Sequence, residues 1–160
     1  MTQPTIRVAG ASGFWGDSAK ATRQLLEVPD LDYIVYDYLA EITMSIMARA
    51  RAKDPAQGYA RDFISAAVVP NLQTISDRGV KVISNAGGVN PEACAAALRA
   101  AIAEKGFDLK VACITGDDLL PYIETLGESG LAEMFTGDDF PDSERVLSAN
   151  AYLGAFPVAA

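Results

Sequence analysis

The chain of 160 residues contains no histidine. This absence excludes Ser-His-Asp and Cys-His catalytic relays, histidine-ligated zinc, and imidazole as an acid or base near neutral pH. Acid–base chemistry must therefore fall to carboxylates, Lys, Tyr, Cys or bound water. Cysteine is scarce as well, since Cys94 and Cys113 are the only two. We interpret them as small buried side chains in a reducing compartment rather than as a disulfide.

Long apolar runs and a surplus of basic charge are also lacking. No run approaches the roughly 20 apolar residues of a membrane-spanning helix, and residues 1–4 do not resemble a signal peptide. Thirteen basic residues face 21 acidic ones, a net charge of −8. Nucleic acids and anionic membranes would be repelled, so neither is expected as a partner. We therefore expect a cytoplasmic protein.

Half of the residues are hydrophobic, which at this length is enough for one buried core and a single α/β domain over residues 1–160. Short apolar runs alternate with helical patterns. Strands are predicted at residues 5–9, 31–36, 80–84, 109–114 and 145–149, and helices at 17–28, 39–53, 59–78, 91–105 and 119–127. Pro70 should kink or divide the third helix, and Gly79 should end it.

This alternation predicts right-handed crossovers and a parallel β-sheet flanked by helices, a Rossmann-like three-layer fold. The alternative is the first half of a (β/α) barrel. Both folds carry ligand sites at the carboxyl ends of their strands. The segments that follow the predicted strands are therefore the candidate site.

The first of these segments is Gly10-Ala11-Ser12-Gly13-Phe14-Trp15-Gly16-Asp17. It is not a G-x-G-x-x-G fingerprint, but glycines before a helix N-terminus can approach an anion closely. Ser12, Gly13, Trp15 and Asp17 are candidate substrate-binding residues, with Trp15 as a wall for an apolar or planar substrate. The alternative is a tight turn in which Asp17 is the helix N-cap.

Two acidic pairs follow the second and fourth predicted strands: Asp37 with Glu41, and Asp117 with Asp118. Each pair could supply a helix cap, but a helix needs only one. If the strand ends converge, these four carboxylates are candidate catalytic groups, with a pKa raised by mutual repulsion. Alternatively, Asp17, Asp37, Glu41 and Asp117 could converge and bind Mg²⁺ or another hard cation through oxygen ligands.

The strongest single candidate is Asn85-Ala86-Gly87-Gly88-Val89-Asn90-Pro91, after the third predicted strand. Two glycines permit positive φ and bring backbone N–H groups close to a ligand. The helix start at Asn90 favours a carboxylate, a phosphate or an enolate-like oxygen. The candidate ligand-binding residues here are Asn85, Gly87, Gly88 and Asn90. The alternative is a turn capped by Asn90, in which the glycines are needed only sterically.

Two further features complete the candidate set. Asn150 and Tyr152 close the fifth predicted strand in the same way and are candidate substrate-binding residues. A modest basic cluster surrounds the Asp54 loop: Arg49, Arg51, Lys53 and Arg61. We interpret it as a solvated face, with an anionic tail such as a CoA phosphate as the alternative occupant.

Taken together, these segments resemble the N-terminal part of the acyclic terpene utilisation protein A (AtuA) family. The resemblance extends from about residue 5 to the end. The blocks that carry it are 11–17, 36–44, 52–55, 58–63, 84–91, 116–120 and 148–154. Since family members are typically much longer, and residues 155–160 read like the opening of a further helix, we expect this chain to be the N-terminal portion of a longer architecture.

The resemblance implies a catabolic role in the degradation of acyclic terpenes and branched acyl-CoA compounds, beside acyl-CoA carboxylases and hydratases. It supplies no catalytic residue and no cofactor. One hypothesis is therefore an enzyme, or its site-bearing domain, that acts on a carboxylate or acyl-CoA intermediate. The other is a non-catalytic small-molecule binding module or subunit associated with such enzymes. Whether the chain forms a homo-oligomer stays open.

Overall fold

The structure is a computed structural model that describes residues 5–160. The expectation that residues 1–4 are not part of a signal peptide lies outside the described residues. The chain divides into two compact units, which we call unit 1 (Met1–Cys113) and unit 2 (Ile114–Ala160). They are described separately, and the single domain stays a prediction. No helix of the described part has the length and apolar character needed to cross a membrane.

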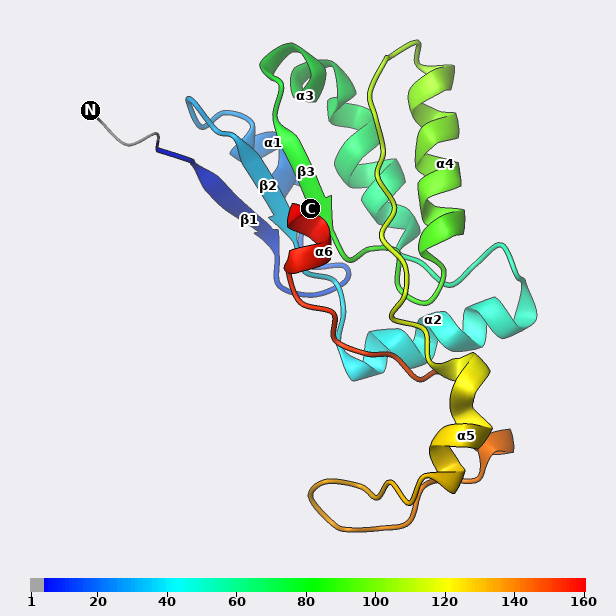
Figure 1. The fold of residues 1–160 in the computed structure, drawn as a ribbon. Helices are drawn as coiled ribbons and strands as arrows, with labels where there is room; N and C mark the ends of the chain where they lie inside the picture. Colours follow the sequence, from blue (N-terminus) through cyan, green and yellow to red (C-terminus); the bar gives the residue numbers. More distant parts are fainter. Residues whose placement is uncertain (1–4) are drawn as a thin grey trace. The chain divides into compact units, whose positions relative to one another are not determined.

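Unit 1 contains three parallel strands, β1 (Val8–Ser12), β2 (Tyr33–Tyr36) and β3 (Lys81–Ser84), in the order β1-β2-β3 (Figure 1). The open parallel sheet with its helices confirms the α/β fold class and is consistent with a three-layer arrangement. The last residues of the three strands, Ser12, Tyr36 and Ser84, are in register. Consequently all three strands reach the carboxyl edge of the sheet together.

The first strand lies three residues later than predicted, and Gly10 is part of it rather than of a loop. Pairing with β2 fixes this position. The backbone N–H of Arg7 donates to Asp32 Oδ2 (2.8 Å), and the Arg7 carbonyl accepts the N–H groups of Asp32 (3.0 Å) and Tyr33 (3.1 Å). The β-branched run predicted a strand at residues 5–9, but pairing with a neighbouring strand outweighs local propensity, and the strand therefore lies at Val8–Ser12.

The predicted strands at 109–114 and 145–149 are wrong. Within the described residues neither segment pairs into a ladder, and a strand exists only through such pairing. The carbonyl of Val111 instead accepts a hydrogen bond from Arg99 Nη2 (2.7 Å). In the second segment the chain forms a 3₁₀ turn, η4 (Ser143–Arg145), and then continues irregularly.

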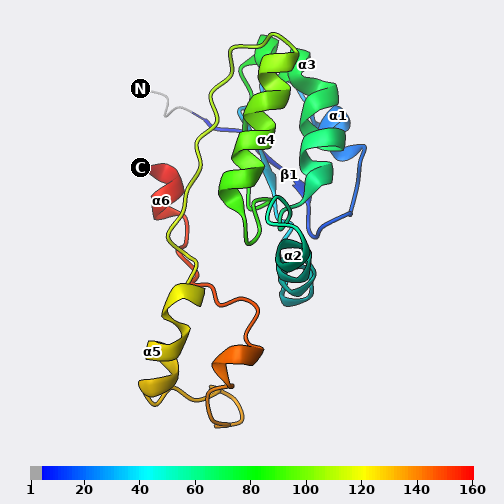
Figure 2. The same cartoon turned by 90° about the vertical axis from the view of Figure 1, so that its right-hand side faces the viewer.

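The helices of unit 1 follow the predicted order. They are α1 (Ala21–Leu25), α2 (Glu41–Lys53), the π-helical η1 (Phe63–Val68), the 3₁₀ turn η2 (Val69–Asn71), α3 (Leu72–Arg78) and α4 (Pro91–Glu104). The predicted division at Pro70 is confirmed, since η2 separates η1 from α3. Gly79 ends α3 with φ +64°. Figure 2 shows α4 lying beside the segment that contains η1 and α3.

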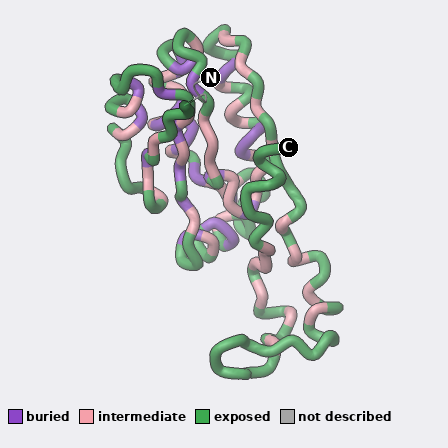
Figure 3. Tube along the Cα trace, turned by 60° about the vertical axis from the view of Figure 1, so that its left-hand side comes forward, coloured by how far each residue is buried: buried purple, intermediate pink, exposed green. Residues whose placement is uncertain are grey.

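The core of unit 1 is built around β2. Ile34 is fully buried, and Tyr36, Tyr38 and Phe63 stack in an aromatic cluster with ring centroids 5.3–6.1 Å apart. The Tyr36 hydroxyl shares a buried 2.6 Å hydrogen bond with Thr22 Oγ1. Figure 3 shows the buried stretches of the trace gathered in this unit.

Helix α2 buries only part of its surface. Helix α2 is not largely buried: Met47 is 1% exposed, but Ile42 is 72% and Ile46 49% exposed. Figure 1 shows the reason, because α2 lies beyond the carboxyl ends of the strands rather than on a face of the sheet. A helix in that position buries only one stripe of its surface.

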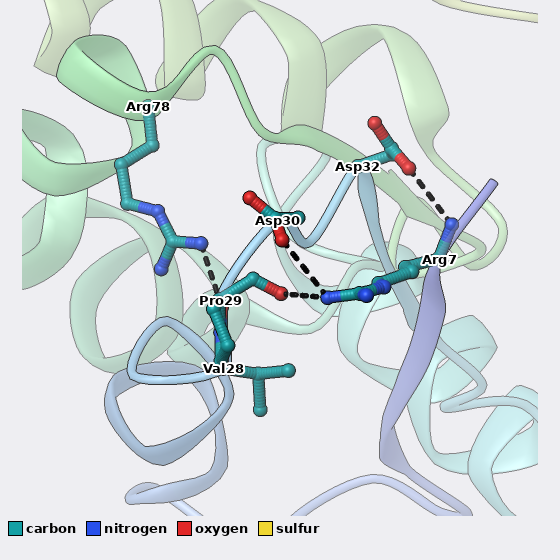
Figure 4. A network of polar contacts seen from close by, with 6 residues as sticks. All are labelled: Arg7, Val28, Pro29, Asp30, Asp32 and Arg78. Carbon is teal, nitrogen blue, oxygen red and sulfur yellow. Dashed lines mark hydrogen bonds and ion pairs between the residues drawn. The ribbon is translucent and has the colours of Figure 1, made fainter. Parts of the chain in front are cut away.

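The opposite, amino-terminal edge of the sheet is closed by two arginines (Figure 4). Arg7 Nη1 donates to the Pro29 carbonyl (2.8 Å) and pairs with Asp30 Oδ2 (3.2 Å), while Arg78 donates to the carbonyls of Leu26 and Val28. These contacts tie the turn between α1 and β2 to β1 and α3. They are structural and leave the carboxyl edge as the candidate site.

Unit 2 consists of η3 (Leu120–Tyr122), α5 (Ile123–Glu128), η4 and α6 (Phe156–Ala159). The helix predicted from residue 119 is confirmed, and residues 129–142 contain only turns and an isolated bridge. Ala132 and Asp139 form an isolated antiparallel bridge, as do Asp118 and Asn150. None of residues 114–160 is buried.

Candidate functional site

The ends of β2 and β3 are joined by a polar pair at the carboxyl edge of the sheet. Asn85 Nδ2 donates to Asp37 Oδ1 (2.7 Å), and Asn85 Oδ1 accepts the backbone N–H of Tyr38 (2.8 Å). The second bond fixes the orientation of the amide, so its NH₂ group faces the carboxylate. Both side chains are exposed. Two candidate residues from segments 48 positions apart are thus brought together.

Asp37 is not a helix cap, so that alternative is wrong. The N-cap of α2 is Ala40, whose N–H donates to Thr43 Oγ1 (2.7 Å). Glu41 is the first residue of α2 and is exposed. Asp37 precedes the helix, so Asp37 and Glu41 do not share a helical face.

The segment after β1 forms a tight turn. Asp17 Oδ2 accepts the N–H of Gly13 (3.0 Å), and the N–H of Asp17 donates to the Phe14 carbonyl (3.2 Å). Helix α1 starts only at Ala21 with Lys20 as N-cap, so Asp17 as the helix cap is wrong. The side-chain oxygen of Ser12 is buried and has no hydrogen-bond partner among residues 5–160. A buried hydroxyl without a partner is uncommon and suits a ligand contact.

The turn at Gly87-Gly88 is closely packed. At Gly88 φ is +54°, and an added Cβ would overlap Met47 Sδ and lie 2.7 Å from the Gly58 carbonyl oxygen. At Gly87 an added Cβ would lie 2.8 Å from Pro91 Cα. The steric alternative therefore accounts for both glycines.

The backbone donors of this turn are already engaged. The N–H groups of Gly88, Val89 and Asn90 donate to the carbonyls of Asn85 (3.2 Å), Gly58 (3.0 Å) and Gly87 (2.9 Å). Asn90 is the N-cap residue of α4 by position, but its side chain does not cap the helix. Its amide instead donates to the carbonyls of Pro55 (2.8 Å) and Gln57 (2.7 Å). These three N–H groups cannot form an oxyanion hole without breaking the turn.

A hollow of about 330 Å³ lies beside this turn, and we call it the Trp15 hollow. Its lining includes Trp15, Met47, Gly58, Tyr59, Arg61 and Asp62. Trp15 Nε1 donates to Asp62 Oδ1 (2.6 Å), which fixes the indole. Burial raises the pKa of Tyr38, and the negative charge of Asp62 raises it further. Tyr38 is therefore a neutral hydrogen-bonding group across the physiological pH range.

The candidate residues of unit 2 form a separate group. Asn150 Nδ2 donates to Asp117 Oδ2 (3.0 Å), and the N–H of Ala151 donates to the Asp117 carbonyl (2.8 Å). Asp118 Oδ1 accepts the N–H of Leu120 (3.0 Å), but the N-cap residues of η3 and α5 are Leu119 and Tyr122, so the expected cap from this acidic pair is wrong. Tyr152 is 99% exposed. Convergence of this group with Asp37 stays a prediction.

The acidic residues do not gather into a cation site. Among residues 5–160 no group of three or more Cys, Asp or Glu side chains could hold a metal ion. Asp17 and Asp37 are each engaged with a neighbouring N–H donor instead. The Mg²⁺ alternative would need carboxylates of both units to meet, and it stays a prediction.

Sequence reasoning missed most of the Trp15 hollow. Tyr59 and Asp62 were not singled out as site residues, and neither was Met47, which lies in the core and also lines the hollow. The available signal was the alternation of aromatic and charged residues in the segment from Gly58 to Phe63. What that signal lacked was the partner, because Trp15 lies 47 residues earlier in the chain.

The fold and the residues at the carboxyl ends of the strands define this chain as an α/β protein with an open parallel sheet, whose carboxyl edge is polar. Residues 6–160 match the family described as acyclic terpene utilisation family protein AtuA. The chain therefore belongs to the AtuA family, as its sequence motifs predicted, and the family name indicates a role in acyclic terpene utilisation. No curated protein and no solved structure matches the chain.

Proposed function

We propose that this chain acts on a carboxylate or acyl-CoA intermediate of acyclic terpene and branched acyl-CoA degradation. The observation that carries the proposal is the Asp37–Asn85 pair at the in-register ends of β2 and β3. Ser12, whose Oγ lacks a partner, ends the neighbouring strand. In open α/β sheets, ligands bind at this edge.

The pair suggests how the chain would act as an enzyme. Asp37 is exposed and its carboxylate is oriented by Asn85, so it is available to remove a proton from a bound substrate. Ser12 Oγ would donate to, or accept from, a ligand oxygen, which would satisfy this buried hydroxyl. Asp37 is then the catalytic base and Asn85 a positioning residue.

A non-catalytic binding module is the second candidate. It is favoured by the turn at Gly87-Gly88, where three backbone donors are engaged within the protein. Without a free oxyanion hole at that turn, the edge would hold a ligand but offer less stabilisation to developing charge. In either case the partner is a small molecule rather than a nucleic acid or a membrane, in a cytoplasmic protein.

The test is a panel of acyl-CoA esters and the matching free carboxylates, with and without Mg²⁺. Thermal unfolding reports binding, and product analysis reports turnover. For an enzyme we expect Asp37→Asn to abolish turnover while the ligand-induced rise in Tm persists. Asp108→Asn, an exposed carboxylate away from the edge, serves as the matched control. A rise in Tm without turnover supports the binding module. The absence of a rise in Tm with every ligand refutes both the enzyme and the binding module.

A further inference from the structure

We propose that the Trp15 hollow binds the heteroaromatic ring of a purine nucleotide and that Arg61 binds its phosphate. The hollow is lined by two aromatic side chains, Trp15 and Tyr59, and by the thioether of Met47. This inference deepens the proposed function because it names the part of the ligand that is held beside the edge. The inference depends on the proposed function only for the acyl group that the nucleotide would carry.

The size of the hollow favours a single ring system. Its volume of about 330 Å³ lies at the lower end of the roughly 300–1,000 Å³ typical of ligand pockets. Such a space accommodates a purine but not a whole cofactor. The remainder of a nucleotide would extend over the rim, where Arg61 is exposed.

The apolar wall is held in place before any ligand binds. The indole of Trp15 is fixed through its only polar atom by the hydrogen bond to Asp62 (2.6 Å). Met47 is 1% exposed and packs against the backbone of Gly88. A rigid aromatic wall loses little entropy when a planar ring stacks on it.

The charge around the hollow is opposite to that of the whole chain. Residues 49–62 carry four basic side chains (Arg49, Arg51, Lys53, Arg61) and two acidic ones, although the chain has a net charge of −8. Within this segment Asp54 accepts the N–H of Ala56 (2.9 Å), Asp62 accepts the indole N–H, and Arg51 donates to the Val89 carbonyl. Arg61 and Asp62 are the charged residues of the lining, so the surplus of positive charge lies in the surrounding segment. A guanidinium is well suited to a phosphate because it donates two parallel hydrogen bonds.

Trp15 is the only tryptophan of the chain, so its fluorescence reports directly on the hollow. The probes are AMP, adenosine and octanoate, titrated into the purified chain. We expect AMP to change the Trp15 emission saturably. Adenosine should bind about tenfold more weakly, because it lacks the charge-assisted contact to Arg61. Octanoate should have no effect at the same concentrations.

Two arginine variants test the role assigned to the phosphate contact. Arg61→Gln should weaken AMP about tenfold and leave adenosine unchanged. Arg23→Gln removes an exposed arginine from α1 and should leave both affinities unchanged. Absence of a saturable AMP response, or an equal loss of AMP affinity in both variants, would overturn the inference.

Acyl-CoA esters and acyl-pantetheines separate this inference from the proposed function. If AMP binds but an acyl-CoA ester binds no more tightly than AMP, the inference holds and the acyl proposal fails. If acyl-pantetheines raise Tm as much as acyl-CoA esters and AMP does not bind, the inference fails and the proposed function stands.

Discussion

The two units reach their structures by different physical means. Unit 1 contains every buried hydrophobic side chain that forms the core, from Ala11 to Ile102. In unit 2, Met134 (83%), Phe135 (85%) and Phe156 (89%) are largely exposed, and no residue is buried. Burial therefore stabilises unit 1, whereas short-range hydrogen bonds, turns and caps shape unit 2. Apolar content alone did not predict this difference, because both units contain large hydrophobic residues.

The charge is divided just as unevenly. Unit 1 has twelve basic and twelve acidic residues, while unit 2 has nine acidic residues against Arg145 alone. The net charge of −8 thus belongs to unit 2. The sequence argument from net charge against anionic partners applies to that unit, and the balanced unit 1 is the part in which a local basic cluster can attract an anion.

The largest effect should come from emptying the core of unit 1. Ile34→Ala should lower the free energy of unfolding by about 2–5 kcal/mol, because the side chain is fully buried in the central strand. Phe135→Ala should change it by less than about 0.5 kcal/mol, because Phe135 is 85% exposed. Urea unfolding followed by far-UV circular dichroism, which reports on both units, measures both free energies. Equal losses in the two variants would remove the contrast between the units.

A loss of comparable size should follow Gly88→Ala. The left-handed backbone costs an alanine about 1–2 kcal/mol, and the overlap with Met47 Sδ and the Gly58 carbonyl adds about 1–3 kcal/mol. Gly79→Ala is the matched control, since Gly79 has φ +64° but open space where a Cβ would stand. It should therefore show only the backbone cost. Identical urea midpoints for the two variants would mean that packing at the Gly87-Gly88 turn is not tight.

Alkaline pH should destabilise unit 1 through its buried acids. Burial raises the pKa of the Cys94 thiol from 9.0 to about 11. The unfolded chain therefore loses this proton first, and the stability contributed by the neutral thiol is present below pH 9 and lost as the pH rises to about 11. Each unit of pKa difference corresponds to about 1.4 kcal/mol.

The measurement is the urea midpoint between pH 8 and pH 11. Cys94→Ala should show a shallower fall than the unchanged chain. Cys113→Ala, which replaces a half-buried thiol, should keep most of the steeper fall, because the charge of Cys113 is the smaller of the two causes that raise the pKa of Cys94. Part of the fall should persist in Cys94→Ala, because burial also raises the pKa of Tyr36 and Tyr38. A fall of unchanged steepness in Cys94→Ala would contradict the assignment.

The smallest effect should be local to unit 2. Glu133 accepts the N–H groups of Phe135 (2.7 Å) and Thr136, and these hydrogen bonds lower its pKa. The stability that this carboxylate contributes to the turn is present above pH 4.5, the ordinary pKa of a glutamate, and is lost as the pH falls through the lowered pKa. Glu133→Ala should speed amide exchange at Phe135 and Thr136 while the unfolding of unit 1 stays unchanged. Unaltered exchange at both amides would show that this carboxylate does not shape the turn.

Local sequence signals predicted a good part of the fold. The breaks at Pro70 and Gly79 are confirmed because they follow from restrictions on single residues: proline lacks an N–H, and glycine alone reaches positive φ without cost. The α4 start at Pro91 is confirmed for the same kind of reason. Predictions that required a distant partner failed, among them the strands at 109–114 and 145–149.

The candidate site shows the same difference between local signals, which the sequence reveals, and contacts with distant residues, which it does not. Sequence placed Asp37 and Asn85 after strands and Trp15 in a turn, since each lies directly after an apolar run. It did not pair Asp37 with Asn85, or Trp15 with Asp62, because each pair joins residues 47 or 48 positions apart. Nor did it show that Asn90 would hold the loop at Pro55 and Gln57 instead of capping α4.

By itself the sequence determined the α/β class, the family and the order of the elements from β1 to α4, because hydrophobic period, proline and glycine act over a few residues. The tertiary structure decided which polar groups are already engaged, which glycines are sterically required, and where a hollow remains. Those properties depend on close packing and on hydrogen bonds between distant segments, and they exist only once the chain has folded.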